Sequence, residues 1–269
     1  MKNYPQILKR VYGEPWAIRR EQLSIIQRLV ESRILGVRGA AAETIEIVGK
    51  NEPEQEVEVE GSTVIIPVHG TIGRHLSMLE LECGGCDLKQ VEIMMDDAER
   101  DSSIARIVFD FNTPGGTVTG VPELAARIRE SQKECVAFTD SQCCSAGYWL
   151  ASQCREFYCT GSSEVGSIGV WMAHFDYSRQ LENDGVRVTE IKAGEMKTLG
   201  APWRPMTEAE RSVLQAGVNK VWEQFKDDVR ATRSVQDEDM EGQVFDGDEA
   251  VSRGLASGLV DSLTEILDS

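Results

Sequence analysis

The chain has 269 residues, 41% of them hydrophobic, which is enough for one large domain or two small ones with a packed core. Its formal net charge of −17 argues against nucleic-acid binding, because phosphate groups need clustered lysine and arginine. No run approaches the ~18 apolar residues of a membrane span, and the N-terminus has no apolar signal segment. The sequence therefore predicts a cytoplasmic protein without a membrane anchor, and its seven scattered cysteines favour reduced thiols over disulfides.

The first sixty residues are predicted to form a helical extension followed by a linker. Between Pro15 and Leu35, apolar residues recur every three to five positions with arginines between them, which is typical of an amphipathic helix. Such a helix covers a core or docks on a neighbouring subunit. Residues 49–60, GKNEPEQEVEVE, are acidic and poor in apolar side chains, so we expect a linker there. We therefore divide the chain into an extension with its linker, residues 1–60, and a main domain, residues 61–269.

From Ser62 onward, short β-prone runs alternate with helical ones, and this alternation predicts βα units in an α/β fold. Thr207 and Glu210 form a capping box that opens a long final helix. The expected order is a strand in 62–70, a helix in 87–101, a strand in 105–112, a helix in 122–133, a strand in 134–138, a helix after 145, a strand in 166–171, a helix near 177–183 and a strand in 186–192.

A serine stands where one of these strands meets the next helix. The apolar run ECVAF is followed by TDSQCCSAGYWLAS, which reads as a strand, a tight turn and a helix with Ser145 at the junction. A side chain at such a junction is exposed at the end of the strand. The free N–H groups of the first helical turn face any negative charge that develops on a substrate oxygen. Ser145 is therefore a candidate nucleophile, although a small-residue helix packed on a sheet would show the same local pattern.

Two further segments carry chemistry. Asn112-Thr-Pro-Gly115-Gly116 lies between a strand and a helix, and its paired glycines allow bare backbone N–H groups to approach a ligand. Such a loop has the form of an oxyanion hole. The segment KAGEMKTLG places Lys197 after the strand predicted in 186–192. A lysine that is buried loses its proton more readily, because a low dielectric disfavours the charged form, and the neutral amine is a general base.

Together these motifs resemble the signal-peptide-peptidase A and protease IV family of serine peptidases, over about residues 62 to 265 and in the same order. The matching segments are the N-[ST]-P-G-G loop at 112–116, the serine segment at 144–148, G-S-I-G-V at 166–170, the G-x-x-K and P-x-R-x-M-T-x-x-E segments at 194–210, and the closing G-x-V-F-x-G pattern with G-L-V-D at 242–261. The resemblance implies a crotonase and Clp-protease-like architecture, a superhelix of repeated β-β-α units, here with an N-terminal helical extension.

The resemblance also implies a role for each matched residue. Ser145 is expected to be the nucleophile and Lys197 the general base, a pair that works without a histidine. The Ser167 hydroxyl is expected to orient the lysine amine. Backbone N–H groups of Gly115 or Gly116 and of Ala146 are expected to hold the oxyanion. The implied reaction is acyl transfer to Ser145 and hydrolysis of the acyl-enzyme, with no metal or other cofactor.

Three alternatives stay open within the site. His174 lies roughly where a Clp-type triad would place its histidine, although the lysine segment is matched at length. Cys144 is a second potential nucleophile, but its position one residue earlier turns it in another direction. Cys83 and Cys86, with His69 and His75 upstream, resemble a zinc knuckle. A single CxxC is a weak signal, and these histidine spacings are not those of common structural zinc sites.

The short chain without a predicted anchor, its N-terminal helix near Trp16 and the segment MAHFDYS at 172–178 resemble the bacteriophage head-maturation branch of the family. This branch implies cleavage of scaffold and capsid proteins inside the procapsid or the host cytoplasm, and assembly into a homo-oligomeric ring. Two other functions remain in view. One is a cytoplasmic peptidase that degrades signal-peptide remnants or oligopeptides. The other is a non-peptidase protein of the same architecture, either an acyl-transfer enzyme or an assembly protein.

Overall fold

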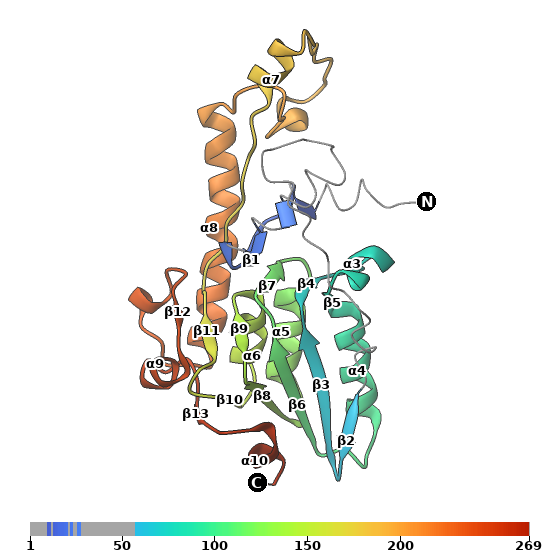
Figure 1. Cartoon of the computed structure of the whole chain (residues 1–269), viewed down its shortest axis with the longest axis vertical. Helices are drawn as coiled ribbons and strands as arrows, with labels where there is room; N and C mark the ends of the chain where they lie inside the picture. Colours follow the sequence, from blue (N-terminus) through green and yellow to red (C-terminus); the bar gives the residue numbers. More distant parts are fainter. Residues whose placement is uncertain (1–9, 12, 21, 24–25, 28–56, 269) are drawn as a thin grey trace.

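The body of the protein is built from a β-β-α unit that repeats along the chain (Figure 1). The computed structural model describes residues 10–11, 13–20, 22–23, 26–27 and 57–268. Each unit contributes a long strand, a short strand that turns away from it, and a helix. The units are β3 (Thr63–His69), β4 (Thr71–Gly73) and α4 (Leu88–Arg100); β6 (Arg106–Asn112), β7 (Gly115–Thr117) and α5 (Val121–Glu130); β8 (Glu134–Thr139), β9 (Gln142–Cys144) and α6 (Ala146–Ser152). The expected α/β fold of repeated β-β-α units is therefore confirmed.

The long and short strands form separate sheets. β3, β6, β8 and β10 (Glu156–Cys159) are parallel neighbours in a six-stranded sheet, which β2 (Glu58–Glu60) and β13 (Gly258–Leu259) complete at its edges. The short strands form two smaller sheets. One has the order β1-β7-β4-β5, with β5 at Gly85–Asp87, and the other has the order β12-β11-β9, with β11 at Glu164–Gly166 and β12 at Val244–Phe245.

Alternation along the long strands divides the core into two layers. Ile107, Phe109 and Phe111 of β6 belong to the main cluster, which includes apolar residues of α4, α5 and α6. Val108 points to the other face, where it joins Ile65 and residues of α10 (Leu263–Leu267) in a smaller cluster. Both faces of the sheet are covered, which explains why these strands read as nearly continuous apolar runs.

The N-terminal helix prediction is wrong at its beginning. Trp16–Ile18 forms strand β1, which pairs antiparallel with β7, and all three residues are buried. The helical spacing is real farther on, since Arg20, Gln22, Leu23, Ile26 and Gln27 are helical. Pairing on both edges overrides the local pattern in β1. Residues 28–35 lie outside the described residues.

The predicted linker and two later strands also differ from expectation. Glu58–Glu60, the end of the predicted linker, is strand β2, whereas residues 49–56 lie outside the described residues. The strand predicted at 166–171 lies earlier, as β11, and only Trp171 forms an isolated bridge. Residues 186–192 form no strand, and Ile191 is 97% exposed. Alternating apolar residues form a strand only where a partner completes the hydrogen bonds, and none of the described residues does so here.

A long segment between β11 and α8 (Glu208–Arg230) projects beyond the sheets (Figure 1). We call residues 172–206 the arm; it contains α7 (Ser178–Asn183) and the 3₁₀ turn η1 (Glu195–Thr198). The predicted capping box at Thr207 and Glu210 is confirmed. Of the apolar positions on α8, only Phe225 and Val229 are buried, because the N-terminal half of the helix runs out along the arm. Two short elements, η2 (Asp237–Asp239) and α9 (Gly247–Ser252), follow α8.

Helix α6 is joined to α8 by a stacked aromatic pair. The rings of Trp149 and Phe225 have centroids 4.4 Å apart and planes inclined by 4°, and both side chains are fully buried. The indole Nε1 of Trp149 also donates a hydrogen bond of 2.9 Å to Asp228 Oδ2. This contact fixes the helix that follows Ser145 against the rest of the molecule.

We expect Trp149→Ala to lower the free energy of unfolding by about 3–5 kcal/mol, because it leaves a cavity and removes the hydrogen bond to Asp228 Oδ2. Urea denaturation of the full chain measures this loss. Val213→Ala, on the exposed side of α8, is the matched control and should change stability by less than about 0.5 kcal/mol. Equal stabilities of the two variants would contradict the role assigned to the stack.

Candidate active site

Ser145 occupies an unusual backbone conformation at the start of α6. It is the N-cap residue, with φ 55° and ψ −114°, and only 1% of its surface is exposed. Non-glycine residues seldom adopt positive φ, and a buried example is a mark of a functional site. Its N–H donates to the carbonyl oxygen of Gly166 at 2.7 Å, and its Oγ lies 3.4 Å from the Gly169 carbonyl oxygen. The strand predicted at 134–138 and the helix after Ser145 are present, but the short strand β9 stands between them, and Ser145 is buried rather than exposed as expected.

Ser167 stands beside Ser145 because their strands are parallel. Gly166, the last residue of β11, pairs with Cys144, the last residue of β9. Ser167 and Ser145 directly follow these two residues, so they lie side by side. Ser167 also has a positive φ of 55°, and its N–H donates to the Gln243 carbonyl oxygen at 2.5 Å. The structure thus places together two of the residues that the sequence singled out.

The paired glycines lie against the same site. A β-carbon on Gly115, where φ is 101°, would lie 2.9 Å from the Cβ of Ser145 and 2.3 Å from the carbonyl oxygen of Ala17. A β-carbon on Gly116 would lie 1.9 Å from the Ile72 carbonyl oxygen. No other residue type fits at either position without moving the backbone.

The backbone N–H groups of these residues differ in their partners. The N–H of Gly115 donates to Thr113 Oγ1 at 3.1 Å, so this amide already has an acceptor. Ala146 is the first residue of α6, where N–H groups lack an intrahelical partner. Gly116 lies opposite Ala17 of β1, between the Arg19–Pro114 and Val118–Pro15 hydrogen bonds of the same pairing, so its amide faces β1. The amides of Gly116 and Ala146 are the better placed donors for an oxyanion.

Lys197 is not brought to Ser145 within one chain. It lies in η1 on the arm, and its side chain is exposed, whereas Ser145 is buried in the body. Its ammonium makes no hydrogen bond or ion pair with any described residue of the chain. The arm carries η1 away from the sheets that hold Ser145 (Figure 1).

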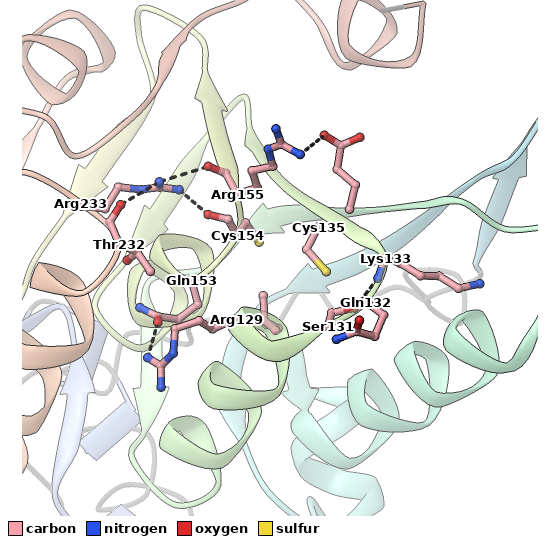
Figure 2. A pocket seen from close by; sticks show the side chains of 12 residues that line it. Arg129, Ser131, Gln132, Lys133, Cys135, Gln153, Cys154, Arg155, Thr232 and Arg233 are labelled. Carbon is pink, nitrogen blue, oxygen red and sulfur yellow. Dashed lines mark hydrogen bonds and ion pairs between the residues drawn. The ribbon is translucent and has the colours of Figure 1, made fainter.

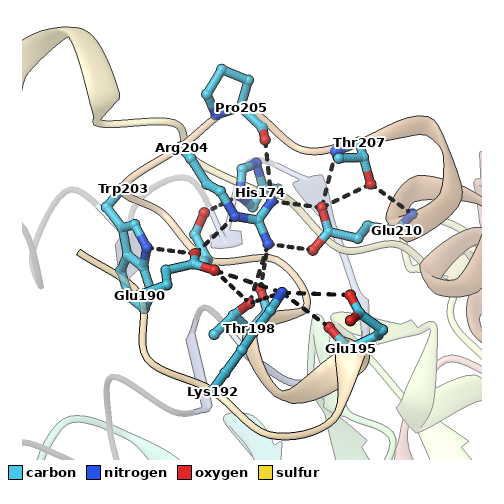
Figure 3. A network of polar contacts seen from close by, with 11 residues as sticks. His174, Glu190, Lys192, Glu195, Thr198, Trp203, Arg204, Pro205, Thr207 and Glu210 are labelled. Carbon is cyan, nitrogen blue, oxygen red and sulfur yellow. Dashed lines mark hydrogen bonds and ion pairs between the residues drawn. The ribbon is translucent and has the colours of Figure 1, made fainter. Parts of the chain in front are cut away.

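A polar network that the sequence analysis did not identify holds the turn containing Lys197 (Figure 3). Arg204 is its centre. The guanidinium contacts Glu190 Oε1 at 2.9 Å and both carboxylate oxygens of Glu210 at 2.7 Å, and it donates to the Thr198 carbonyl oxygen at 3.0 Å. The two matched residues of the P-x-R-x-M-T-x-x-E segment are thus an ion pair that ties the arm to the first turn of α8. The sequence signal for this network is the capping box of Thr207 and Glu210, with Arg204 six residues before the glutamate.

The carboxylates of this network are stabilised in their charged form. The hydrogen bonds from Arg204 lower the pKa of Glu210 well below its usual value, with a further contribution from the backbone N–H of Thr207. Arg204 and the Trp203 indole lower the pKa of Glu190 in the same way. The network is therefore fully ionised at neutral pH.

The alternative nucleophile and base occupy other environments. Burial raises the pKa of Cys144 to about 12, and its Sγ contacts the Glu164 carbonyl oxygen at 3.5 Å. This thiol stays protonated and is directed away from the serine. His174 lies on the arm, where a ring nitrogen lies 3.3 Å from the Ala201 carbonyl oxygen.

The cysteines of the CxxC motif have different exposures. Cys83 is exposed and follows α3 (Met78–Glu82), whereas Cys86 is buried in β5, and burial raises its pKa to about 12. His69 instead contacts Asp110, with 2.8 Å between Nε2 and Oδ2. Among the described residues, no group of three or more His, Cys, Asp or Glu side chains could hold a metal ion.

A cavity of about 550 Å³ lies away from this site (Figure 2). Its lining is rich in arginine and lysine and includes two cysteines, Cys135 and Cys154. Arg233 donates into neighbouring carbonyl oxygens there, and Arg129 contacts the Gln153 amide oxygen. None of the residues that line the cavity is a predicted catalytic residue.

Comparison with protein families gives two matches. The family described as Peptidase family S49 matches residues 127–268, and the NfeD1b N-terminal domain matches residues 64–178. The first match spans more than half of the chain, including Ser145, Ser167, Lys197 and the Arg204 network. In the part of the chain that the structure describes, no helix is both long and apolar enough to span a membrane.

Individual relatives include two phage proteins. The capsid assembly protease C of Escherichia phage lambda is 28% identical over 99% of this chain and 65% of its own length. The head-tail preconnector protein GP5 of Enterobacteria phage P21 is 28% identical over 97% of this chain and 54% of its own. The chain thus spans about half to two thirds of these relatives. Among solved structures, a mutant of a membrane-bound stomatin-specific protease with a substrate peptide aligns over 78% of this chain and 80% of its own, with 14% identity and a TM-score of 0.42.

The Arg204 network predicts an acid-sensitive contribution to stability. Because the pKa of Glu210 is lower in the folded chain, its contribution is complete above the unfolded value of about 4.3 and is lost as the pH falls further. We expect Glu210→Gln to lower Tm at pH 7, and the difference from wild type to narrow between pH 5 and pH 3. Glu208→Gln, an exposed neighbour, should show no such narrowing. A Tm difference for Glu210→Gln that is constant with pH would contradict the assignment.

Proposed function

The chain belongs to peptidase family S49, and from this premise we propose that it is a serine endopeptidase whose nucleophile is Ser145. The observation that supports the proposal most strongly is the position of Ser145. Its strained backbone sits at the start of a helix, between Ser167 and the Gly115-Gly116 strand. This is the arrangement that acyl transfer requires, because the attacking oxygen and the oxyanion donors must face one point.

The proposed reaction proceeds in two stages. Ser145 Oγ attacks the carbonyl carbon of the peptide bond while its proton passes to the Lys197 amine. The oxyanion accepts hydrogen bonds from the amides of Gly116 and Ala146, each worth about 3 kcal/mol in the transition state. The amine product leaves with the proton from Lys197, and an acyl-enzyme remains. Water then releases the acid product by the same path in reverse order. The scheme uses no metal or organic cofactor.

We further propose that Lys197 reaches the serine of a neighbouring copy of the chain. A single chain holds Lys197 on an exposed turn of the projecting arm, while its own Ser145 lies in the body. The arm also exposes Val186, Val188 and Ile191, apolar residues that a second copy would cover. A lysine buried at such an interface loses its proton more readily than one in water. A head-to-tail contact of this kind closes into a ring when its rotation permits.

The proposed substrates are protein segments of a phage capsid and its scaffold, in the host cytoplasm or the procapsid. Two phage relatives, one of them described as a capsid assembly protease, cover almost all of this chain. Residues 61–269 are the proposed peptidase domain and residues 1–60 its extension. A cytoplasmic signal-peptide or oligopeptide peptidase would use the same residues with other partners. An acyl-transfer or assembly protein would not need Ser145 and Lys197 together.

Subunit mixing tests the dyad. We expect Ser145→Ala and Lys197→Ala each to lose cleavage of an unstructured protein substrate by about a thousandfold or more. An equimolar mixture, dissociated and reassembled, should regain about one quarter of wild-type activity, because one interface in four then pairs an intact serine with an intact lysine. Cleavage is followed by intact mass spectrometry.

The control replaces one partner in the mixture with the double variant Ser145→Ala, Lys197→Ala. That mixture has no interface with both residues and should stay inactive. An active Lys197→Ala variant would show that another group is the base. Two inactive variants that fail to complement each other would place the dyad within one chain.

A further inference from the structure

The N-terminal strand β1 lies directly over the proposed catalytic site. We propose that β1 occupies the groove that binds extended peptide substrates, and that substrate enters only when this strand leaves. The inference rests on the proposed function, since it concerns how the Ser145 site is reached. In this proposal residues 16–18 of the chain occupy the position that a substrate segment would take.

The groove has two walls, and β1 is hydrogen-bonded to both. On one side β1 pairs antiparallel with β7, with Ala17 opposite Gly116 and Ile18 opposite Gly115. On the other side Trp16 and Trp171 exchange two backbone hydrogen bonds of 3.0 and 2.9 Å. An extended segment that is paired along both edges adopts the conformation in which peptides bind by strand addition.

The backbone of β1 passes next to the nucleophile. The Ala17 carbonyl oxygen and the Ser145 Cβ both approach the same side of Gly115, at 2.3 and 2.9 Å from where its β-carbon would be. The peptide group between Ala17 and Ile18 therefore lies over the serine and the strand that carries the Gly116 amide. A substrate carbonyl would have to take this place before Ser145 could attack it.

Burial shows how closely the site is covered. Trp16, Ala17 and Ile18 are 3% exposed or less, and Ser145 beneath them is 1% exposed. Trp16 and Ile18 belong to a small apolar cluster with Val11 and Leu23, whereas Ala17 between them belongs to the main core. The two large side chains of β1 therefore pack with the N-terminal segment, and removal of the strand would take only the small Ala17 side chain from the main core.

A few polar contacts hold the end of β1. The Arg19 guanidinium forms an ion pair with Glu164 of β11, and the Arg19 N–H donates to the Pro114 carbonyl oxygen at 3.1 Å. The Trp171 indole donates to the Ile18 carbonyl oxygen at 3.1 Å. Both Arg19 and Glu164 are partly exposed, so their ion pair can be removed without opening the core.

A tethered strand competes strongly with a free peptide. The effective concentration of β1 at the groove is of the order of millimolar. Substrate binds only to chains in which β1 has left the groove, so the apparent affinity falls in proportion to that open fraction. Weakening the Arg19 anchor raises the open fraction. The affinity of the groove for peptide therefore depends on the Arg19–Glu164 ion pair, although this pair includes neither Ser145 nor Lys197.

Peptide binding to the full chain tests the inference without catalysis. All proteins carry Ser145→Ala, and the probe is a fluorescein-labelled peptide of residues 13–20, GEPWAIRR. We expect Arg19→Ala to bind the probe about fivefold more tightly than the parent, the effect of losing one partly buried ion pair from β1 alone. Glu164→Ala removes the partner of Arg19 in β1 and in the probe alike, so it should bind the probe like the parent. Arg100→Ala, which removes an exposed ion pair on α4, is the matched control and should bind like the parent.

Hydrogen exchange on the same proteins gives a second measurement. Amides of residues 115–117 should exchange faster in Arg19→Ala and return to the parent rate when the probe is added. Equal probe affinity in all variants, together with unchanged exchange, would overturn the inference and show that β1 is a permanent strand of the sheet.

The same substitutions in chains with intact Ser145 separate this inference from the proposed function. If probe binding rises in Arg19→Ala but no chain cleaves protein, the groove assignment stands and the peptidase proposal fails. If the chains cleave protein at equal rates whether or not Arg19 is present, the peptidase proposal stands and the groove assignment fails.

Discussion

The parallel pairing of β9 with β11 is the constraint on which the rest of the site depends. Both strands end at this pair, with Cys144 opposite Gly166. The residue that follows each strand is a serine with positive φ, Ser145 after β9 and Ser167 after β11. The N–H of Ser145 is used to bond Gly166, so the strained turn is held by the sheet itself. Glycine at 115 is required because the adjacent strand approaches this turn too closely for a side chain.

Much of the body could be predicted from sequence because each long strand carries its own signal. β6 and β8 are apolar on both faces and are followed by glycine or polar residues, and Ser145 lies at a junction that sequence marks clearly. Strand β1 could not be predicted, because WAI forms a strand only when β7 and Trp171, both distant in the sequence, supply its partners. The reverse error occurred at residues 186–192, which have a strand pattern but lack a partner among the described residues.

The lysine segment shows another limit of sequence reasoning. Its motif indicates which residue types recur together, but not which of them touch. In the structure Arg204 and Glu210 form an ion pair with 2.7 Å between their atoms, and this pair fixes the turn that precedes it. The motif thus contains both Lys197, the proposed base, and the ion pair that holds the turn of Lys197 in place. In the proposed arrangement Lys197 reaches the serine of a second chain, and no pattern within one sequence encodes such a contact.

Two requirements for activity follow if both proposals hold, and they are physically independent. Removal of β1 exposes the serine and the Gly116 amide, but it does not supply a base. Docking of a neighbouring arm supplies the lysine, but it leaves β1 over the groove. An isolated chain then satisfies neither requirement, which would protect surrounding proteins before assembly. Release of β1 breaks its pairing with β7 and Trp171, whereas docking of the arm places the turn that carries Lys197 against another chain. Assembly therefore need not release the strand, and a substrate that pairs with both walls of the groove can displace it directly.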